Sequence, residues 1–204
     1  MLSHKKYMEI QNLNPEIGDM FEPGDQIIIQ EKIDGSNASF QYDRETDSVI
    51  CFSRNQILSP ELHLRGFYEW VQKLDKEQVH AVLGDNLRMF GEWLVRHTVP
   101  YPKDCYETLY CFDVFDMEQH RYLPQDQVKA LAEQLGLRYV PVFYEGSFTS
   151  WEDYQPLVGK TELGGEIGEG IIIKNLSTLS GNLAYTKIVH ENFSENKKTW
   201  KKKQ

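Results

Sequence analysis

The segment EKIDGSN, residues 31–37, holds the residue best suited to covalent chemistry, because Lys32 stands at the end of a β-branched run and directly before a glycine turn. A lysine amine in its neutral form is a nucleophile that can carry a covalent intermediate. The alternative is a surface lysine beside a hairpin turn, and the short pattern KxDG arises by chance in many proteins. The segment therefore becomes informative only through the residues that accompany it.

Further groups of basic, acidic and aromatic residues follow Lys32 in order along the chain. They are Ser53 with Arg54, FGEW at residues 90–93, FDVF at residues 112–115, EGIIIK at residues 169–174, and Lys187. An ordered series of short motifs arises by chance much more rarely than any single member of the series.

In these motifs and their order the sequence resembles the covalent nucleotidyltransferases, the superfamily of DNA ligases, RNA ligases and mRNA capping guanylyltransferases. The resemblance runs from about residue 31 to residue 193, nearly the whole chain. The asparagine that ends EKIDGSN, the GEW triplet and the strand CFDVFD are most similar to the RNA ligase 2-like group. The resemblance implies an ATP-dependent RNA ligase, and with it a role in RNA repair.

That resemblance implies a reaction in three steps, with Mg²⁺ or Mn²⁺ as the metal. AMP passes from ATP to Lys32 and then to an RNA 5′-phosphate, and it is displaced when an RNA 3′-hydroxyl closes the phosphodiester. DNA nick sealing, GMP transfer as in capping, and a nucleotide- or RNA-binding module without catalysis are the alternatives. The RNA substrate stays open between a nicked duplex, a tRNA break and single strands, because contacts outside the motifs follow shape.

The resemblance also assigns roles to individual residues. The two later lysines would contact the α-phosphate, Glu92 the ribose hydroxyls and Phe112 the adenine, whereas Arg54 and Asn37 match positions associated with phosphates and sealing. Each also has an ordinary structural explanation, such as a strand lysine, a surface acid or a core phenylalanine. The expected catalytic residues are Lys32, Asp34, Asn37, Lys174 and Lys187, the expected nucleotide-binding residues are Glu31, Lys32, Arg54, Glu92, Phe112, Asp113, Lys174 and Lys187, and the expected metal ligand is Glu169.

Transfer of AMP to a lysine requires a neutral amine, which a free lysine side chain near pH 7.4 provides in only about one molecule in a thousand. Burial and neighbouring cations both favour the neutral form. Lys174, Lys187 and bound Mg²⁺ are the expected cations. A hard carboxylate oxygen from Glu169 suits Mg²⁺, which takes few protein ligands.

The last motif departs from the family pattern, because Lys187 is followed by Ile188 and Val189 and the usual KxK arrangement is missing. One expected phosphate contact therefore has no candidate residue. We expect a single adenylation domain over residues 1–204, with a lysine-rich tail and no OB or other C-terminal domain evident. Either a partner, such as a repair protein, supplies the role of such a C-terminal domain, or the chain is a minimal ligase.

The net charge of −9 is unusual for a protein that meets a polyanion, but Lys197, Lys198, Lys201, Lys202 and Lys203 concentrate positive charge in the tail. The tail either contacts RNA phosphates or is a solvated terminus. The three cysteines form no CxxC pair, and no apolar run suited to a signal peptide or membrane span opens the sequence. We therefore expect a soluble, cytoplasmic protein.

Short strands and few helices must position these residues. Mixed strands and helices without βαβ regularity predict an α+β class, the nucleotidyltransferase (DNA/RNA ligase adenylation) fold, with largely antiparallel sheets and flanking helices. β-Branched and alternating runs predict strands at residues 27–32, 38–42 and 49–53, which together suggest an antiparallel meander, and at residues 89–94, 109–115, 138–144, 171–174 and 184–189. Helical spacing and caps predict helices that begin at Ser59 and Pro60, over residues 124–135 before Gly136, and after Ser150.

Overall fold

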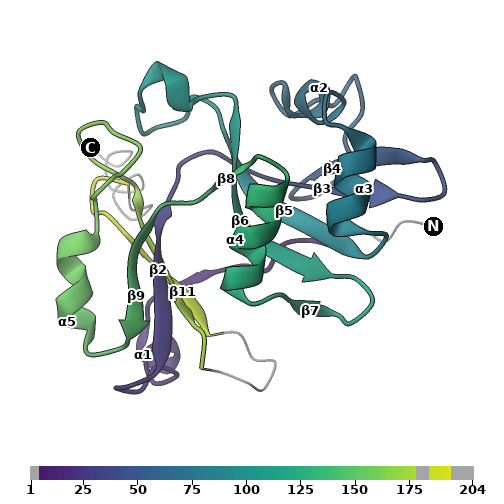
Figure 1. Ribbon diagram of the computed structural model, residues 1–204. Coiled ribbons are helices and arrows are strands. Elements are labelled where there is room, and N and C mark those ends of the chain that lie inside the picture. Colours follow the sequence, from purple (N-terminus) through teal and green to yellow (C-terminus); the bar gives the residue numbers. More distant parts are fainter. Residues whose placement is uncertain (1–4, 178–183, 194–204) are drawn as a thin grey trace. The chain divides into compact units, whose positions relative to one another are not determined.

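The computed structural model describes residues 5–177 and 184–193 (Figure 1). Its contacts group the chain into two compact units, each assembled from separate stretches of sequence. The first holds residues 5–8, Gly35–Val95 and Asp104–Val140, and the second holds Glu9–Asp34, Arg96–Lys103 and the described residues from 141 onward. The single domain expected over residues 1–204 stays a prediction, and the five lysines of the tail lie outside the described residues.

The first unit is built on a six-stranded sheet with the order β4-β3-β5-β6-β7, in which β8 runs parallel to β6 and the other pairings are antiparallel. Helix α2 packs on β4, α3 on β3 and α4 on β6. The strands are β3 (Ser36–Asp43), β4 (Ser48–Ser53), β5 (Leu87–Leu94), β6 (Thr108–Asp116), β7 (Arg121–Tyr122) and β8 (Arg138–Tyr139), and the helices are α2 (Phe67–Val71), α3 (Lys76–Leu83) and α4 (Gln125–Gln134).

Alternation along β3 gives this sheet one apolar and one polar face, because successive side chains of a strand point to opposite sides. Ala38 and Phe40 join the buried cluster that also contains Phe67, Trp93 and Val128. The alternate positions of β3, which begin with Asn37 and Ser39, carry polar side chains. The polar face therefore displays Asn37 and its direct partner on β5, Glu92, from the sequence motifs of this unit.

The second unit has a five-stranded sheet with the order β1-β11-β10-β2-β9, antiparallel except for the pairing of β1 with β11. Short helices precede and follow its strands (Figure 1). The elements are β1 (Gln11–Asn12), α1 (Pro15–Gly18), β2 (Gln26–Lys32), the 3-10 turn η1 (Lys103–Cys105), which begins at the last residue of this unit, β9 (Val142–Ser147), α5 (Trp151–Tyr154), the 3-10 turn η2 (Gln155–Leu157), β10 (Gly170–Asn175) and β11 (Tyr185–Val189).

One face of this second sheet forms an apolar core. Ile27 and Ile29 of β2 and Ile171 and Ile173 of β10 are fully buried, and they cluster with aromatic residues such as Phe148. The intervening residues of the same strands point to the opposite face. Most of the lysines expected to act in catalysis are among these intervening residues. None of the helices in the described part of the chain combines the length and apolar character that a membrane crossing requires.

The α+β class with largely antiparallel sheets is confirmed, and so is the antiparallel pairing of the second predicted strand with the third, but the first predicted strand does not join them in a meander. β3 pairs with β4, whereas β2 pairs with β10 and β9 in the other sheet. The run at residues 138–144 is likewise two strands in two sheets, because the N–H of Val140 still bonds to Cys111 whereas Pro141 has no N–H and offers its carbonyl to Glu31. A local pattern shows that a strand forms but not which strand it joins.

The helix predicted from Ser59 begins only at Phe67. The backbones of Ser59 and Leu62 pair with each other, and Leu64 and Arg65 have the positive φ angles of 46° and 52° that are incompatible with a helix. The inward positions were nevertheless placed correctly, because Phe67 is fully buried. The helices at α4 and α5 are confirmed within one or two residues, whereas α3 was not predicted.

Candidate active site

Three predicted lysines lie on one face of the sheet in the second unit. Lys32 at the end of β2 pairs with Gly170 of β10, and Lys187 of β11 pairs with Ile172. Directly paired residues share a face, and so do alternate residues of one strand. Gly170, Ile172 and Lys174 alternate along β10, so the pairing brings Lys32, Lys174 and Lys187 to the same side, opposite the apolar core.

Lys32 forms an ion pair with Glu169, the residue that precedes β10. The Lys32 Nζ atom lies 2.6 Å from Oε1 of Glu169, and the two side chains are only 23% and 16% exposed. Gly170 makes this arrangement possible, since a Cβ atom there would collide with the backbone of Ile188 in β11. The glycine of the EG pair thus permits the close strand approach that holds Glu169 beside Lys32.

The pKa of the Glu169 carboxyl depends on its burial and on the charged residues around it. Burial raises the pKa of Glu169, whereas the charges of Lys32 and Lys187 lower it and that of Asp34 raises it. Its second oxygen, Oε2, is buried and has no hydrogen-bond partner among the residues that the structure describes. Such an oxygen fits a hard divalent cation, which carboxylates bind well.

Lys174 and Lys187 differ in their surroundings. Lys174 is almost completely buried, with its Nζ atom 5.1 Å from the centre of the Tyr185 ring. A cation at this distance over an aromatic face is stabilised by the ring. Lys187 is half-buried and close enough to Glu169 to influence its carboxyl pKa. A substrate anion on this face would therefore meet one fixed and one more accessible lysine.

Asp34 is engaged by the protein backbone. Its Oδ2 atom accepts hydrogen bonds from the N–H groups of Thr98 and Val99 at 2.7 and 2.8 Å, and its own N–H donates to the Tyr101 hydroxyl at 3.1 Å. Its predicted catalytic role stays a prediction. The contacts present in the structure are those of a residue that positions residues 98–101 beside Lys32.

Glu31 points away from the lysine face, as expected for the neighbour of Lys32 in a strand. Its carboxylate is buried, and Oε2 accepts a hydrogen bond from the N–H of Glu162 at 2.9 Å. Burial raises the pKa of Glu31, while Thr161 and the backbone N–H groups of Glu162 and Leu163 oppose the change. Its predicted contact with a nucleotide stays a prediction, whereas its contact with the loop is present.

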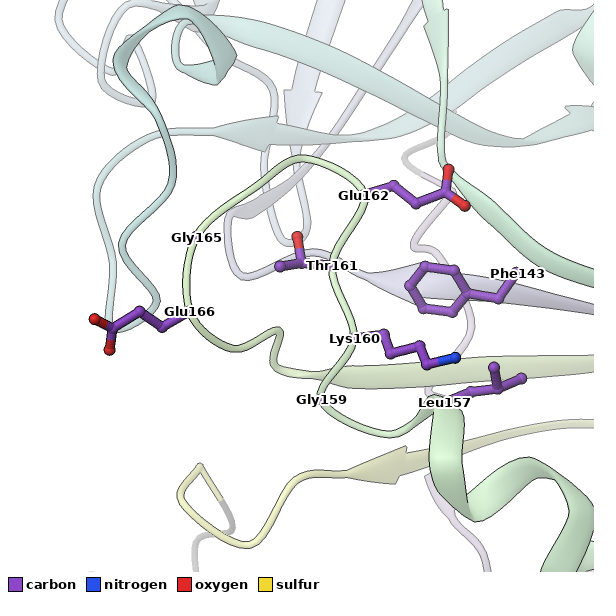
Figure 2. Close-up of a pocket in the computed structure, with 8 residues that line it drawn as sticks. All are labelled: Phe143, Leu157, Gly159, Lys160, Thr161, Glu162, Gly165 and Glu166. Carbon is purple, nitrogen blue, oxygen red and sulfur yellow. The ribbon is translucent and has the colours of Figure 1, made fainter.

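The loop that Glu31 contacts borders an open hollow of about 420 Å³ in the second unit (Figure 2). Two of its lining residues, Phe143 and Leu157, also pack against the apolar core. The lining residues are Phe143, Leu157, Gly159, Lys160, Thr161, Glu162, Gly165 and Glu166. No residue of the predicted site lines this hollow, so it is separate from the lysine face.

Asn37 and Glu92 face each other on neighbouring strands of the first unit. They are direct partners between β3 and β5, and both are half-buried. Side chains of directly opposite residues are close enough to act on one ligand. Arg54 follows β4 immediately and is exposed. The first unit therefore brings Asn37 and Glu92 together and leaves Arg54 at the end of its strand.

Phe112 occupies an irregularity in β6. Phe90 pairs with Asp113 and Gly91 with Cys111, so Phe112 is the extra residue of a bulge. A bulge re-aims a side chain relative to a regular strand. The Phe112 ring meets the edge of the Tyr7 ring at a centroid distance of 4.9 Å. The predicted adenine platform is thus half-buried and supported by the N-terminal segment.

Asp113 belongs to a buried hydrogen-bond network. Its Oδ2 atom accepts from the Tyr7 hydroxyl at 2.5 Å and its Oδ1 atom from the Gln125 amide at 2.6 Å, and the Tyr139 hydroxyl donates to Gln125. Asp113 itself has no exposed surface. The predicted contact of Asp113 with a nucleotide stays a prediction. Its hydrogen bonds in the structure hold strand β6 in place next to Phe112.

Residues 25–189 match the family described as RNA ligase. The chain belongs to the RNA ligase family. The match covers Lys32, Glu169, Lys174 and Lys187. No match is found among curated proteins.

Solved RNA ligase structures share the fold of this RNA ligase family member. An archaeal ATP-dependent RNA ligase matches with a TM-score of 0.68 and 19% identity over 93% of this chain and 49% of its own. A mutant of Naegleria gruberi RNA ligase with ATP and Mn matches with a TM-score of 0.70 and 20% identity over 93% of this chain and 57% of its own. The predicted nucleotidyltransferase fold is confirmed, and the chain spans about half the length of these structures.

Several residues of the site have no sequence signal. Tyr101, whose pKa is raised by burial, and the N–H groups of Thr98 and Val99 lie more than sixty residues from Asp34, which they contact. Tyr7 reaches Asp113 across 106 positions. No local pattern or spacing in a single sequence could have identified these partners.

Proposed function

We propose that this chain is an ATP-dependent RNA ligase that carries AMP covalently on Lys32. The observation that carries the proposal is the Lys32–Glu169 pair on a face that also holds Lys174 and Lys187, in a chain of the RNA ligase family. A nucleophilic amine, an acid suited to a metal and two further cations are the groups that nucleotidyl transfer to lysine requires.

ATP and a divalent cation are the proposed reactants at this face. Naegleria gruberi RNA ligase mutants with ATP and Mn, and one with AMP and Mn, are among the structures that share the fold. The buried Oε2 atom of Glu169, which has no hydrogen-bond partner among the described residues, fits a divalent cation, which would supply positive charge to the phosphate oxygens. Mg²⁺ or Mn²⁺ suits a carboxylate ligand.

In the first step the neutral amine of Lys32 attacks the α-phosphorus of ATP. A nitrogen–phosphorus bond forms, the bond to the bridging oxygen of the β-phosphate breaks, pyrophosphate leaves, and the nitrogen releases one proton to solvent. Because the attack needs a free lone pair on Nζ, the ion pair with Glu169 must open before the bond forms. Lys174 and Lys187 then stabilise the charge that develops on the phosphate.

In the second step a 5′-phosphate oxygen of RNA displaces Lys32 from phosphorus, and the lysine regains a proton. In the third, a 3′-hydroxyl attacks the activated 5′-phosphate, loses its proton and expels AMP. Phe112 and Glu92 would hold the adenine and the ribose, and Asn37 and Arg54 the phosphates during sealing. Asp34, Glu31 and Asp113 would act through the segments that they hold.

An end-joining assay tests this assignment against its alternatives. RNA with a 5′-phosphate is incubated with the protein and ATP, and compared with GTP in place of ATP and with DNA strands of the same sequence. The proposal predicts joined RNA with ATP. Joining of DNA alone would assign the chain to DNA nick sealing, and labelling by GTP without joining would assign it to capping chemistry.

A further inference from the structure

Asp34 fixes the position of the segment Arg96–Lys103 in the second unit. The Asp34 carboxylate accepts hydrogen bonds from the N–H groups of Thr98 and Val99, and the Asp34 N–H donates to the hydroxyl of buried Tyr101. One carboxylate with two backbone donors forms a charge-assisted contact that is stronger than a neutral one. The segment is therefore tied to the residue two positions after Lys32.

The loop before Glu169 holds the same segment from another side. Gly165 has a φ angle of 108°, and a Cβ atom on it would lie 2.8 Å from the carbonyl oxygen of Pro100. A Cβ atom on Gly164 would likewise lie only 2.9 Å from the Pro102 ring. Only glycine permits this approach and this backbone conformation. The segment thus lies between the stretches that carry Lys32 and Glu169.

Its exposed side chains are basic or neutral, although the chain as a whole has a net charge of −9. Arg96, His97 and Lys103 are exposed, whereas Val99 and Tyr101 are buried on the anchored side. The segment contains no acidic residue. A backbone that is held in place and presents cations to solvent is the arrangement through which proteins position nucleic-acid phosphates.

We propose that the segment Arg96–Lys103 contacts the phosphate backbone of the RNA that the chain joins. The choice of RNA rests on the proposed ligase function. The triphosphate of ATP offers the same chemistry, but its α-phosphate must reach the partly buried Lys32 amine, whereas Arg96 and Lys103 are exposed at the two ends of the segment. An extended polyanion can reach both exposed cations at once.

The test is RNA binding by the double variant Arg96→Ala/Lys103→Ala, measured with a labelled single-stranded 5′-phosphorylated RNA from about 50 to about 200 mM salt. Two lost phosphate contacts should weaken binding about tenfold or more at low salt and make the slope of log affinity against log salt shallower by about 1.4. The control is Lys73→Ala/Lys129→Ala, which removes two exposed lysines of the first unit and should change neither quantity.

Several outcomes overturn the inference: wild-type affinity and slope in Arg96→Ala/Lys103→Ala, an equal loss in the control, or no RNA binding by the wild-type chain. Unchanged RNA binding with a higher ATP requirement for labelling of the protein would assign the segment to the triphosphate instead. Binding needs no catalysis, so its result is separate from that of the ligase proposal. A chain that binds RNA through this segment but is not labelled by ATP supports the inference and contradicts the proposed function.

Discussion

Lys32 and Glu169 depend on each other at the scale of single residues. Glu169 is mostly buried, and the ion pair with Lys32 compensates for part of the loss of hydration. The other carboxylate oxygen has no partner among the described residues, so Glu169 can still accept a cation. The same side chain can thus hold the amine in place and bind metal on its second oxygen.

Replacing Glu169 by Gln should slow labelling of the protein by ATP at least about tenfold, because the amide keeps the shape but loses the charge that would bind a metal. Rates are measured over a Mg²⁺ titration, and excess metal should not restore them. Glu166→Gln, an exposed acid of the same loop, is the matched control and should react at the wild-type rate. Equal rates for the two variants would assign Glu169 to structure alone.

At the scale of elements, strand β2 makes different contacts on its two faces, because the two faces carry different groups. Lys32 points to the lysine face, while Glu31 binds the loop that precedes Glu169 from the other side. A carboxylate held by a backbone N–H connects the strand that carries Lys32 to the loop that precedes Glu169. We infer that Glu31 is a positioning residue, which the sequence motif alone does not distinguish from a ligand.

Glu31→Gln should alter the pH dependence of stability. Burial raises the pKa of Glu31, so above the unfolded-state value of about 4.3 the native protein holds a proton that the unfolded chain has lost. The contribution of Glu31 to the free energy of unfolding therefore falls as pH rises from that value to the folded-state pKa. The free energy of unfolding of Glu31→Gln, relative to wild type, should rise over the same interval and then level off.

Urea unfolding at a series of pH values measures this difference. Exposed Glu166→Gln serves as the control and should give a difference that does not vary with pH. A flat difference for Glu31→Gln as well would show that the Glu31 carboxyl has the same pKa in the folded and unfolded states. That result would contradict the inferred cost of burying this side chain.

Strands and helices could be predicted from the sequence where their buried positions produce a strong local pattern of apolar residues. The β-branched runs of β2 and β10 and the helical spacing of α4 are of this kind. The pairing of β2 with its neighbours could not be predicted, because β2 joins strands that are more than a hundred residues away. The start of α2 was missed because positive φ angles at Leu64 and Arg65 are set by the surrounding turn.

Motifs in the sequence name candidate residues for the site but do not show how these residues are arranged. Motif order identified Lys32, Glu169 and Lys187, and strand pairing places them in one region of the second unit. The supports of Asp34 and Asp113 come from residues with no motif, such as Tyr101 and Tyr7. Spacing in one sequence carries no information about such long-range hydrogen bonds.

Positive charge is distributed unevenly at the scale of the whole molecule. The chain has a net charge of −9, yet five lysines lie in its last eight positions, outside the described residues. The described part adds the basic segment Arg96–Lys103. An acidic protein that binds RNA needs such local concentrations of cations, because affinity depends on the phosphates that are neutralised.

Truncation after Asn196 should therefore leave labelling of Lys32 near the wild-type rate, while joining of RNA ends falls and its salt dependence becomes shallower. Lysine contacts with phosphates release counterions, and their loss removes part of the salt dependence. Rates of labelling and of joining are measured on the same preparations. A truncated protein that labels poorly but still seals pre-adenylylated RNA would show instead that the tail orients the phosphates of ATP.

The most direct test of the central claim is labelling with ATP that is radioactive at the α-phosphate, in the presence of Mg²⁺. Wild-type protein should form an acid-labile adduct, since a phosphoramidate is expected between phosphorus and Lys32. Lys32→Ala removes the amine, and Lys32→Arg offers a guanidinium that stays protonated, so neither should be labelled. Labelling of either variant at the wild-type level would place the nucleophile elsewhere and contradict the account.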